Sequence, residues 1–200
     1  MTTARLILIL AAGASSRMRG TDKLLEEIDG QPQIRRITKA ALATGAAVFV
    51  TLPTDRPARV AALSDLAVHR IAVPGAAEGM ATSIREGLCA LPPDRPLLLL
   101  LADLPEITED ELRRMLTEQA ATPQAIVRAT SFDGRPGHPV GFPAALRPAL
   151  AALQGDAGAR ALLAENRDLI RLIALPEQHA TTDLDTPEDW AAWRAAHASG

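Results

Sequence analysis

Hydrophobic runs of strand length alternate with segments of helical periodicity along the first half of the chain. The runs are rich in branched aliphatic residues, which is typical of strands buried on both faces, and they cover residues 5–10, 47–52, 68–73 and 97–102. Between them, apolar residues recur three and four positions apart, as in amphipathic helices. These residues are Ile34, Ile37, Ala41 and Leu42, then Val60, Leu63 and Leu66, and then Ile84, Leu88 and Leu91. The alternation predicts right-handed βαβ units and a mostly parallel, Rossmann-like sheet with helices on both faces.

The second half of the chain is less regular. Thr108 precedes three acidic residues, which predicts that it caps a helix. The glycine- and proline-rich stretch 131–139 is expected to be a loop. No linker or repeat interrupts the chain, so we predict a single three-layer α/β/α domain over residues 1–200. The remaining expected elements are strands at 125–130 and 169–175, short helices at 143–153 and 158–165, and a closing helix at 187–196.

Composition narrows the class of protein. The 200-residue chain is 48% hydrophobic and 22% charged, which is typical of an ordinary globular protein. Its net charge of −3 argues against a nucleic-acid coat, and no apolar run approaches the ~20 residues of a membrane span. Cys89 is the only cysteine, and its place in a helical pattern predicts a buried, inert thiol in a reducing compartment. We therefore expect a cytoplasmic protein with neither a nucleic-acid nor a membrane partner.

Residues that could bind a ligand or take part in catalysis are concentrated where the first hydrophobic run ends. Residues 11–16 are all small, and Arg17, Arg19 and Lys23 follow them closely. Small side chains let backbone N–H groups approach an anion, and the cations can neutralise it. This segment predicts a polyphosphate site at the carboxyl end of the first strand, the alternative being a solvated run of charges. It is neither a Walker A sequence nor a dinucleotide fingerprint, because Gly13 lacks the partner residues that either motif requires.

Carboxylates at two places in the chain could hold a metal. Asp103 directly follows the fourth hydrophobic run, so it is expected at the carboxyl end of a strand. A carboxylate there can hold Mg²⁺ against nucleotide phosphates, although a turn or helix cap is the alternative. Asp183 and Asp185 lie two residues apart, so in an extended segment both could face one ion. Thr186, in contrast, is predicted to cap the closing helix.

Four segments of the chain carry motifs that occur in this order in a known family. They are Leu10-Ala11-Ala12-Gly13-Ala14-Ser15-Ser16-Arg17-Met18 with Asp22-Lys23-Leu24-Leu25, Gly79-Met80-Ala81-Thr82-Ser83-Ile84-Arg85-Glu86-Gly87, Gly134-Arg135-Pro136-Gly137-His138-Pro139, and Gly155-Asp156-Ala157-Gly158-Ala159-Arg160. The opening segment resembles that of the molybdenum cofactor nucleotidylyltransferases, within the MobA-like NTP transferases. It is most similar to the cytidylyltransferases that make molybdopterin cytosine dinucleotide. The resemblance covers nearly the whole chain, from Leu10 to Trp190.

The resemblance implies a fold of the nucleotide-diphospho-sugar transferase type and a reaction. A nucleotidyl group would pass from an NTP to a phosphate acceptor, and pyrophosphate would leave. Mg²⁺ would be held by Asp103 and Asp185, and Arg17 and Lys23 would act in catalysis by neutralising the pyrophosphate. The implied partners are CTP, the molybdopterin cofactor and a recipient molybdoenzyme or its maturation chaperone. Nucleotide contacts are implied at Leu10, Ala11, Ala12, Gly13, Ser15, Ser16, Gly79 and Ser83, and acceptor contacts at Gly137, His138 and Pro139.

Several of these assignments have a structural alternative. Ser83 could instead bond the backbone early in a helix, and the His138 segment could be a surface turn. Asp156 is expected to cap a helix, while Arg160 is either a phosphate contact or a solvated helix charge.

The chain also departs from the family pattern, and one position bears on the base. Leu104 stands where the family has glutamine after the metal-binding aspartate, and no asparagine precedes Gly79. In the family, Leu-Ala-Ala-Gly accompanies cytosine and Leu-Ala-Gly-Gly accompanies guanine. The methyl group of Ala12 is expected to narrow the floor beneath the base, so we predict CTP.

Other functions stay open on the sequence alone. The chain could be a guanylyltransferase for the same cofactor, or a nucleotidylyltransferase for another phosphorylated metabolite. A non-catalytic nucleotide-binding module has no need of two separated metal carboxylates, and an NAD-dependent oxidoreductase would lack its glycine fingerprint here.

Overall fold

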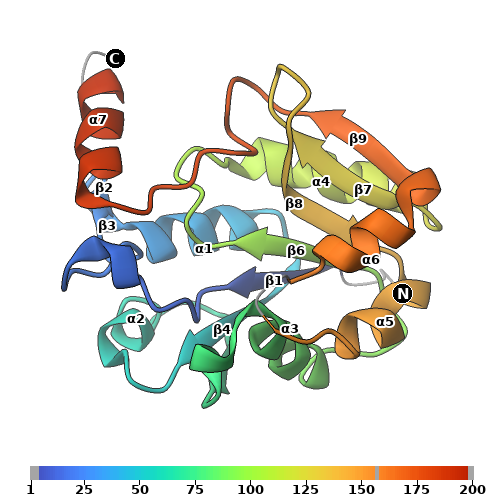
Figure 1. Ribbon diagram of the computed structural model, residues 1–200, viewed down its shortest axis with the longest axis horizontal. Coiled ribbons are helices and arrows are strands. Elements are labelled where there is room, and N and C mark those ends of the chain that lie inside the picture. Colours follow the sequence, from blue (N-terminus) through green and yellow to red (C-terminus); the bar gives the residue numbers. More distant parts are fainter. Residues whose placement is uncertain (1–4, 156–157, 198–200) are drawn as a thin grey trace.

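A seven-stranded sheet runs through the centre of the protein, and helices cover both of its faces (Figure 1). The computed structural model describes residues 5–155 and 158–197. The sheet has the order β5-β4-β1-β6-β8-β7-β9, and a separate short ribbon pairs β2 with β3. The strands are β1 (Leu6–Leu10), β2 (Glu27–Ile28), β3 (Gln31–Pro32), β4 (Ala47–Pro53), β5 (His69–Val73), β6 (Leu97–Leu101), β7 (Ile126–Thr130), β8 (Pro136–Phe142) and β9 (Ile170–Ala174).

The helices form the two outer layers of an α/β domain. Side chains of α1 and α4 pack on one face of the sheet, and those of α3, α5 and α6 pack on the other. The helices are α1 (Gln33–Ala43), α2 (Pro57–Ala61), α3 (Met80–Cys89), α4 (Glu109–Ala121), α5 (Arg147–Ala151), α6 (Arg160–Glu165) and α7 (Pro187–His197). Short 3₁₀ turns lie at Ser16–Met18, Ala76–Glu78, Ala144–Leu146 and Arg167–Leu169. No helix in the described ranges is long and apolar enough to cross a membrane.

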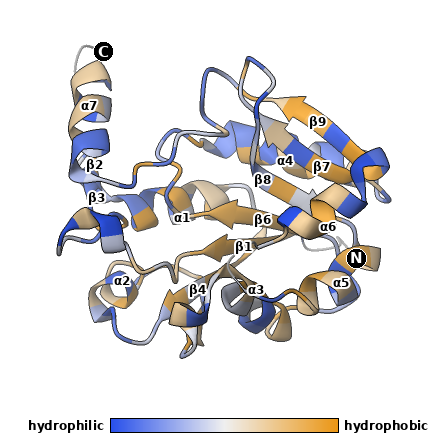
Figure 2. Ribbon diagram, in the orientation of Figure 1, coloured by the Kyte–Doolittle hydropathy of each residue, from blue (hydrophilic) through white to orange (hydrophobic). Residues whose placement is uncertain are grey.

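Alternate side chains of β1 pack into the two halves of the core. Ile7 and Ile9 join the apolar cluster under α1 and α4, whereas Leu6 and Leu8 join the cluster under α3, α5 and α6. Successive side chains of a strand point to opposite faces, so a central strand of a three-layer fold is hydrophobic throughout. Figure 2 shows β1 and β6 in the hydrophobic colour along their lengths, and burial on both faces is confirmed for these two runs.

The order of the strands places a ligand crevice at the carboxyl end of β1. This strand pairs in parallel with β4 on one side and with β6 on the other. When the connections that follow two neighbouring parallel strands run to opposite faces of the sheet, a crevice opens between the carboxyl ends of those strands. The loop after β1 and the turn after β6, which carries Asp103, therefore meet at one edge of the sheet, as the sequence predicted.

The expectation of a loop over residues 131–139 is wrong, because a strand begins inside it. β8 lies between β6 and β7 and runs antiparallel to both. The register with β7 shifts between Arg128 and Thr130, and the N–H of His138 donates to the carbonyl of Ala180 at 2.9 Å instead of to the sheet. A bulged position of this kind accommodates prolines, which have no N–H to donate. Pairing with β6 and β7 therefore determines the structure of this segment, although its glycines and prolines favour a loop.

Three smaller expectations are also wrong. β5 lies at the edge of the sheet and is mostly exposed, so the run 68–73 is not buried on both faces. α2 ends at Ala61, and Leu63 and Leu66 lie in turns, because a three-residue spacing of apolar side chains also fits successive turns. Cys89 is the last residue of α3 and is exposed, because the helix buries its opposite side under the sheet.

The predicted helix caps at Thr108 and Thr186 are confirmed. Thr108 and Glu111 form a reciprocal capping box at the start of α4. At the start of α7, the N–H of Asp189 donates to the Thr186 hydroxyl at 3.1 Å, and the Asp189 carboxylate accepts from the N–H of Thr186 at 2.8 Å. The second cap fixes the chain direction immediately after Asp185.

Candidate functional site

The loop after β1 faces a cleft of about 510 Å³ at the carboxyl edge of the sheet, which we name the first cleft. Residues 12–17 line one side of it. The amide N–H groups of residues 12–15 have no hydrogen-bond partner in the described parts of the chain. A concave run of free amides is an anion-binding feature, and the predicted polyphosphate loop therefore has suitable geometry.

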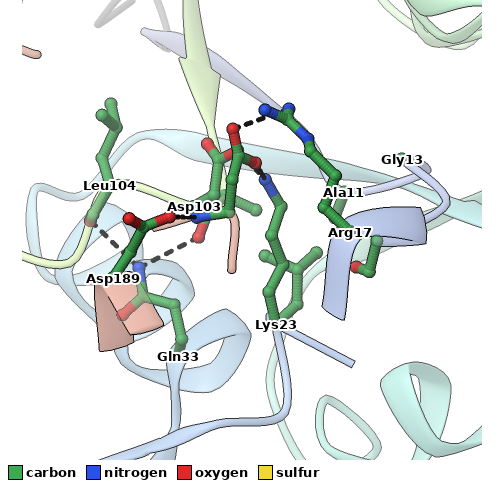
Figure 3. Close-up of polar contacts among 12 residues, drawn as sticks. Ala11, Gly13, Arg17, Lys23, Gln33, Asp103, Leu104 and Asp189 are labelled. Atoms are coloured by element: carbon green, nitrogen blue, oxygen red, sulfur yellow. Dashed lines mark hydrogen bonds and ion pairs between the residues drawn. The ribbon is translucent and has the colours of Figure 1, made fainter. Parts of the chain in front are cut away.

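Lys23 lies at the centre of the first cleft and joins two carboxylates that are distant in sequence. Its ammonium group donates to Asp103 Oδ2 at 2.6 Å and to Asp185 Oδ1 at 2.7 Å. The other carboxylate oxygen of Asp185, Oδ2, forms an ion pair with Arg17 Nη2 at 2.6 Å. Figure 3 shows the Arg17 and Lys23 side chains extending from the loop region toward the carboxylate cluster around Asp103. The candidate catalytic and metal-binding residues thus form one connected group.

The electrostatics of this group are dominated by paired charges. Burial alone would lower the pKa of the Lys23 ammonium, but the Asp103 and Asp185 carboxylates raise it above its ordinary value. Lys23 is therefore firmly cationic at neutral pH. Partial burial, followed by the negative charges of Asp185 and Asp103, raises the pKa of Asp183. Adding a cation to this cleft favours the ionised form of Asp183.

Packing of α7 holds Asp185 in place. Leu184 and Trp190 join Met18 and Ile28 in a small apolar cluster, so the start of α7 packs against the segment that follows β1. Residues from the two ends of the chain therefore meet beside Lys23 (Figure 1). This arrangement explains how Asp185 reaches a strand edge formed far earlier in the sequence.

Gln33 holds the turn that carries Asp103, and no sequence pattern indicates this role. Its side chain is fully buried at the start of α1. Its Nε2 donates to the carbonyls of Ala102 and Leu104 at 2.9 and 3.0 Å (Figure 3). A polar side chain that satisfies both carbonyls flanking Asp103 fixes the direction of the carboxylate.

A second cleft of about 330 Å³ adjoins the first. The two share Met80, Leu101, Arg160 and Asp183 in their walls. Gly137 and His138 line the second cleft, so the predicted acceptor residues face a space next to the predicted nucleotide residues. Two ligands could therefore meet near the shared wall.

His138 is neutral at physiological pH. Burial is the main cause that lowers its pKa from 6.5 to about 4, and Arg128 acts in the same direction although Asp103 opposes it. Its Nδ1 is buried and has no hydrogen-bond partner among the described residues. Gly137 is needed beside it, because a Cβ at that position would lie 1.9 Å from the carbonyl oxygen of Ala180. The His138 segment is therefore a packed strand rather than the surface turn considered as an alternative.

Three arginines around the second cleft add positive charge, and sequence reasoning missed two of them. Arg128 and Arg135 line the cleft together with Arg160. Burial, and then the charge of Arg160, lowers the pKa of Arg128. Neither Arg128 nor Arg160 has a carboxylate partner in the described ranges. The rest of the lining is largely apolar and includes Leu104, at the position where the family has glutamine; we call this part the apolar wall. The second cleft thus combines an apolar surface with positive charge.

The other sequence candidates divide between the cleft and its surroundings. Leu10, Gly79 and Ser83 line the first cleft, and the Ser83 hydroxyl bonds no described group, so its alternative role on the backbone is not realised. Ala11 lies behind the loop, where its N–H bonds Thr51, and it does not line either cleft. This geometry does not support the implied nucleotide contact at Ala11.

Three further candidates also lie away from the clefts or outside the described ranges. Pro139 follows His138 in β8 but lines neither cleft, so the implied acceptor contact there is not supported. Arg19 pairs with Glu188 at 2.8 Å and is exposed. Asp156 lies outside the described residues.

Asp103 and Asp185 are suited to hold a divalent metal together with a ligand. Asp103 Oδ1 is buried and accepts no hydrogen bond from residues 5–155 or 158–197. In the same ranges, no three His, Cys, Asp or Glu side chains gather closely enough to hold a metal alone. Mg²⁺ is commonly bound by one or two carboxylates plus substrate phosphates, so two carboxylates facing an anion-binding loop fit it.

Comparison with known proteins places the chain in a family. The model described as the MobA-like NTP transferase domain matches residues 7–170. The chain belongs to the MobA-like NTP transferase family. Within that span lie β1 with its loop, Lys23, Asp103 and the β8 segment, whereas Asp185 and α7 lie beyond it.

Relatives of this MobA-like chain carry different names. Nicotine blue oxidoreductase from Paenarthrobacter nicotinovorans is 30% identical over 186 residues, which cover 90% of this chain and 91% of the relative. Rv0371c from Mycobacterium tuberculosis H37Rv has a crystal structure with a TM-score of 0.84 and 29% identity, covering 96% and 98% of the two chains. A second crystal structure of Rv0371c, a complex with manganese, has a TM-score of 0.78 and 26% identity, covering 95% and 97%.

A nucleotidyl transferase from Methanothermobacter shares the fold, with a TM-score of 0.76, 20% identity and coverage of 97% of each chain. The MobA-like fold of this protein is therefore that of nucleotidyltransferases, and a relative binds a divalent metal ion.

Proposed function

We propose that the protein transfers CMP from CTP to the phosphate of the molybdopterin cofactor and releases pyrophosphate. The observation that carries the proposal is the position of Lys23, bonded to both Asp103 and Asp185 beside a loop of free amides. A transferase needs these parts together, because the α-phosphate must be aligned and the leaving pyrophosphate must be neutralised.

In the proposed reaction, an oxygen of the acceptor phosphate attacks the α-phosphorus of CTP. The bond from that phosphorus to the oxygen shared with the β-phosphate breaks, and its electron pair leaves with pyrophosphate. A phosphate acceptor is already ionised at neutral pH, so no general base is required. The neutral His138, at the second cleft, is accordingly not assigned a proton-transfer role.

The cations of the first cleft would bind the phosphates. The amides of residues 12–15 would hold the β- and γ-phosphate oxygens, with Arg17 and Lys23 adding positive charge on the same side. Lys23 is held by carboxylates on two elements, so its ammonium group is positioned before a ligand arrives. Preorganised charge of this kind stabilises a transition state without further rearrangement.

Asp103 and Asp185 are proposed to hold the divalent metal. When bound there, Mg²⁺ or Mn²⁺ would neutralise phosphate charge as a Lewis acid. The manganese complex of Rv0371c supports a divalent metal in this family. The buried, unpartnered Asp103 Oδ1 supports the assignment in this chain.

Ala12 is the basis for proposing CTP rather than GTP. It is buried and lines the first cleft, immediately beside Gly13, where we propose that it forms the floor beneath the base. A methyl group at this position leaves less depth for a purine than a glycine would, which favours the smaller pyrimidine.

The second cleft is proposed to bind the acceptor. Its arginines would bind the anionic group of the acceptor, and its apolar wall would cover a planar ring. Arg160, in the wall that the two clefts share, would lie near the acceptor phosphate. The product would then be passed to a molybdoenzyme or its maturation chaperone.

A second candidate function is an oxidation–reduction reaction. The name of the nicotine blue oxidoreductase relative is the observation that favours it, because that protein is 30% identical over most of both chains. The apolar wall around Leu104 would also accept an aromatic substrate. A hydride transfer makes no use of two carboxylates that share a lysine, so we place this function second.

The test is pyrophosphate release by the purified protein with Mg²⁺ and molybdopterin cofactor, with CTP, GTP, ATP and UTP assayed separately. We expect release with CTP. Release with GTP alone would move the protein to the guanylyl branch. A parallel assay follows NADH and NADPH oxidation with an aromatic acceptor, and turnover there without any pyrophosphate release would replace the transferase with the oxidoreductase.

A further inference from the structure

Arg59 is completely buried behind the loop after β1, and all of its donors point at that loop or at Asp22. Arg59 is the middle residue of α2, and its side chain has no exposed surface. Its Nη1 donates to the carbonyls of Ala11 and Gly13 at 2.6 and 2.8 Å. Its Nη2 donates to Ser15 Oγ at 2.9 Å and to Asp22 Oδ1 at 2.8 Å, and its Nε donates to Asp22 Oδ2 at 2.7 Å. These five bonds use the full donor capacity of an arginine.

These bonds separate the carbonyls of the loop from its amides. The carbonyls of Ala11 and Gly13 are turned back onto Arg59, and that of Ala14 accepts from Arg56 at 2.9 Å. The amides of residues 12–15 are left without a protein partner in the described ranges, on the segment that lines the first cleft. A loop whose carbonyls point away from a ligand while its amides are free presents positive potential to an anion.

We propose that Arg59 is a positioning residue for the nucleotide phosphates, which acts by holding the loop in its anion-binding conformation. It lines neither cleft, so it acts through the backbone and not by touching the ligand. The inference rests on the proposed function in one respect, namely that the first cleft binds the phosphates of an NTP.

The chemistry of the site explains why an arginine is required. A guanidinium is a planar fork that can reach carbonyls, a hydroxyl and a carboxylate at once, whereas an ammonium group has only three donors at one point. Asp22 balances the charge of Arg59, and its own pKa is lowered by the Arg59 hydrogen bonds and charge, although burial opposes this. A buried pair with all its hydrogen bonds made gives a loop conformation that is unique as well as stable.

Arg147 provides a matched control within the same chain. It is also a buried arginine, and its Nη1 also donates to two backbone carbonyls, those of Pro92 and Arg95, both at 3.0 Å. It lines neither cleft. Arg147→Lys therefore removes a buried fork that makes two hydrogen bonds, where Arg59→Lys removes one that makes five, and both substitutions keep the positive charge of the side chain.

The experiment measures binding of inorganic pyrophosphate and of CTP with Mg²⁺ by calorimetry, with thermal unfolding and amide hydrogen exchange on the same samples. For Arg59→Lys we expect both affinities to fall by roughly tenfold, and exchange to rise in peptides covering residues 11–17. For Arg147→Lys we expect wild-type affinities for both ligands, even if its melting temperature falls as far as that of Arg59→Lys. In turnover, Arg59→Lys should raise KM for CTP more than it lowers kcat.

Each contrary result has a distinct meaning. Wild-type affinities in a folded Arg59→Lys protein, or an equal loss of affinity in Arg147→Lys, would overturn the role of Arg59 and leave the proposed function intact. A wild-type protein that binds neither pyrophosphate nor CTP would overturn the proposed function, and this inference with it. Should Arg59→Lys not fold, Asp22→Asn removes the charge that orients the fork, and unchanged pyrophosphate affinity in that variant would contradict the proposal.

Discussion

The ammonium nitrogen of Lys23 lies 2.6 Å from the carboxylate of Asp103, eighty residues further along the chain. The same ammonium group lies 2.7 Å from the carboxylate of Asp185. The two carboxylates proposed to hold a divalent metal are therefore already neutralised in part by a side chain of the protein. A metal ion and Lys23 would both draw on these two carboxylates, so the two positive charges compete for them.

Replacing Lys23 tests this competition directly. Lys23→Met puts an uncharged side chain of similar length at this position. In the absence of nucleotide, we expect this variant to bind Mn²⁺ roughly tenfold more tightly than the wild type, because the Asp103 and Asp185 carboxylates lose the cation that pairs with them. Nucleotidyl transfer should fall at the same time, since the leaving pyrophosphate loses a cation. Electron paramagnetic resonance of free Mn²⁺ during a titration measures the first effect.

The control for this prediction is Lys39→Met, because the exposed Lys39 bonds only Gln31, at 3.3 Å, among the described residues. Weaker Mn²⁺ binding by Lys23→Met than by the wild type would mean that the lysine supports the metal site instead of competing with it.

Asp103→Asn should abolish transfer while preserving the fold. The amide keeps the shape of the carboxylate, and Lys23 keeps its second partner Asp185, so unfolding temperature should change little. Removing a single group that stabilises charge in a transition state can cost about 10²–10³-fold in kcat, and we expect a loss of at least this size. Turnover of CTP at saturating acceptor is the measurement, with Asp65→Asn as the control, because Asp65 forms an exposed pair with Arg35. Near-normal turnover in Asp103→Asn would remove the metal assignment.

The sequence predicted the parts of the site that depend on local pattern. β1 and β6 are hydrophobic throughout because both are central strands, and the loop of small residues and Asp103 follow their carboxyl ends directly. Parallel neighbours bring such ends together, so a meeting of Asp103 with the first loop follows from topology alone. The place of Asp185 in the site came from the resemblance, because no local pattern links it to β6.

The sequence could not predict side chains whose partners are backbone groups of distant segments. Arg59 and Gln33 bond carbonyls that lie tens of residues away, and in the sequence they stand among ordinary polar positions. The β8 strand was missed for a related reason, since its pairing with β6 and β7 is set by the fold and not by its glycines and prolines. Exposed Cys89 shows the same limit, because a helical pattern gives the periodicity of a helix but not its last buried residue.

The half-buried imidazole of His138, whose Nδ1 is shielded from solvent, should make the protein sensitive to acid. Its pKa is about 4 in the folded protein and 6.5 in its ordinary state, so between these values the unfolded chain binds a proton that the native protein does not. Stability is therefore complete above about pH 6.5 and falls as the pH drops toward 4, by at most about 3 kcal/mol.

In His138→Asn this part of the acid sensitivity should be absent, while His69→Asn, at an exposed position on β5, should keep the wild-type profile. Urea unfolding between pH 4 and pH 7.5 measures the difference. Parallel profiles for wild type and His138→Asn would contradict the assignment of a histidine that stays neutral in the folded protein.

The choice of base should depend on Ala12. Its side chain is buried at the floor of the first cleft, and removing the methyl group deepens the space where the base is proposed to lie. One methyl group in a pocket discriminates ligands by roughly 10–200-fold. We expect Ala12→Gly to raise kcat/KM for GTP relative to CTP by about tenfold, mainly through a lower KM for GTP. Ala14→Gly is the control, because it changes the same loop beside Ala12 without altering the buried floor. An unchanged ratio in Ala12→Gly, or the same shift in Ala14→Gly, would show that loop flexibility and not the methyl group sets the preference for the base.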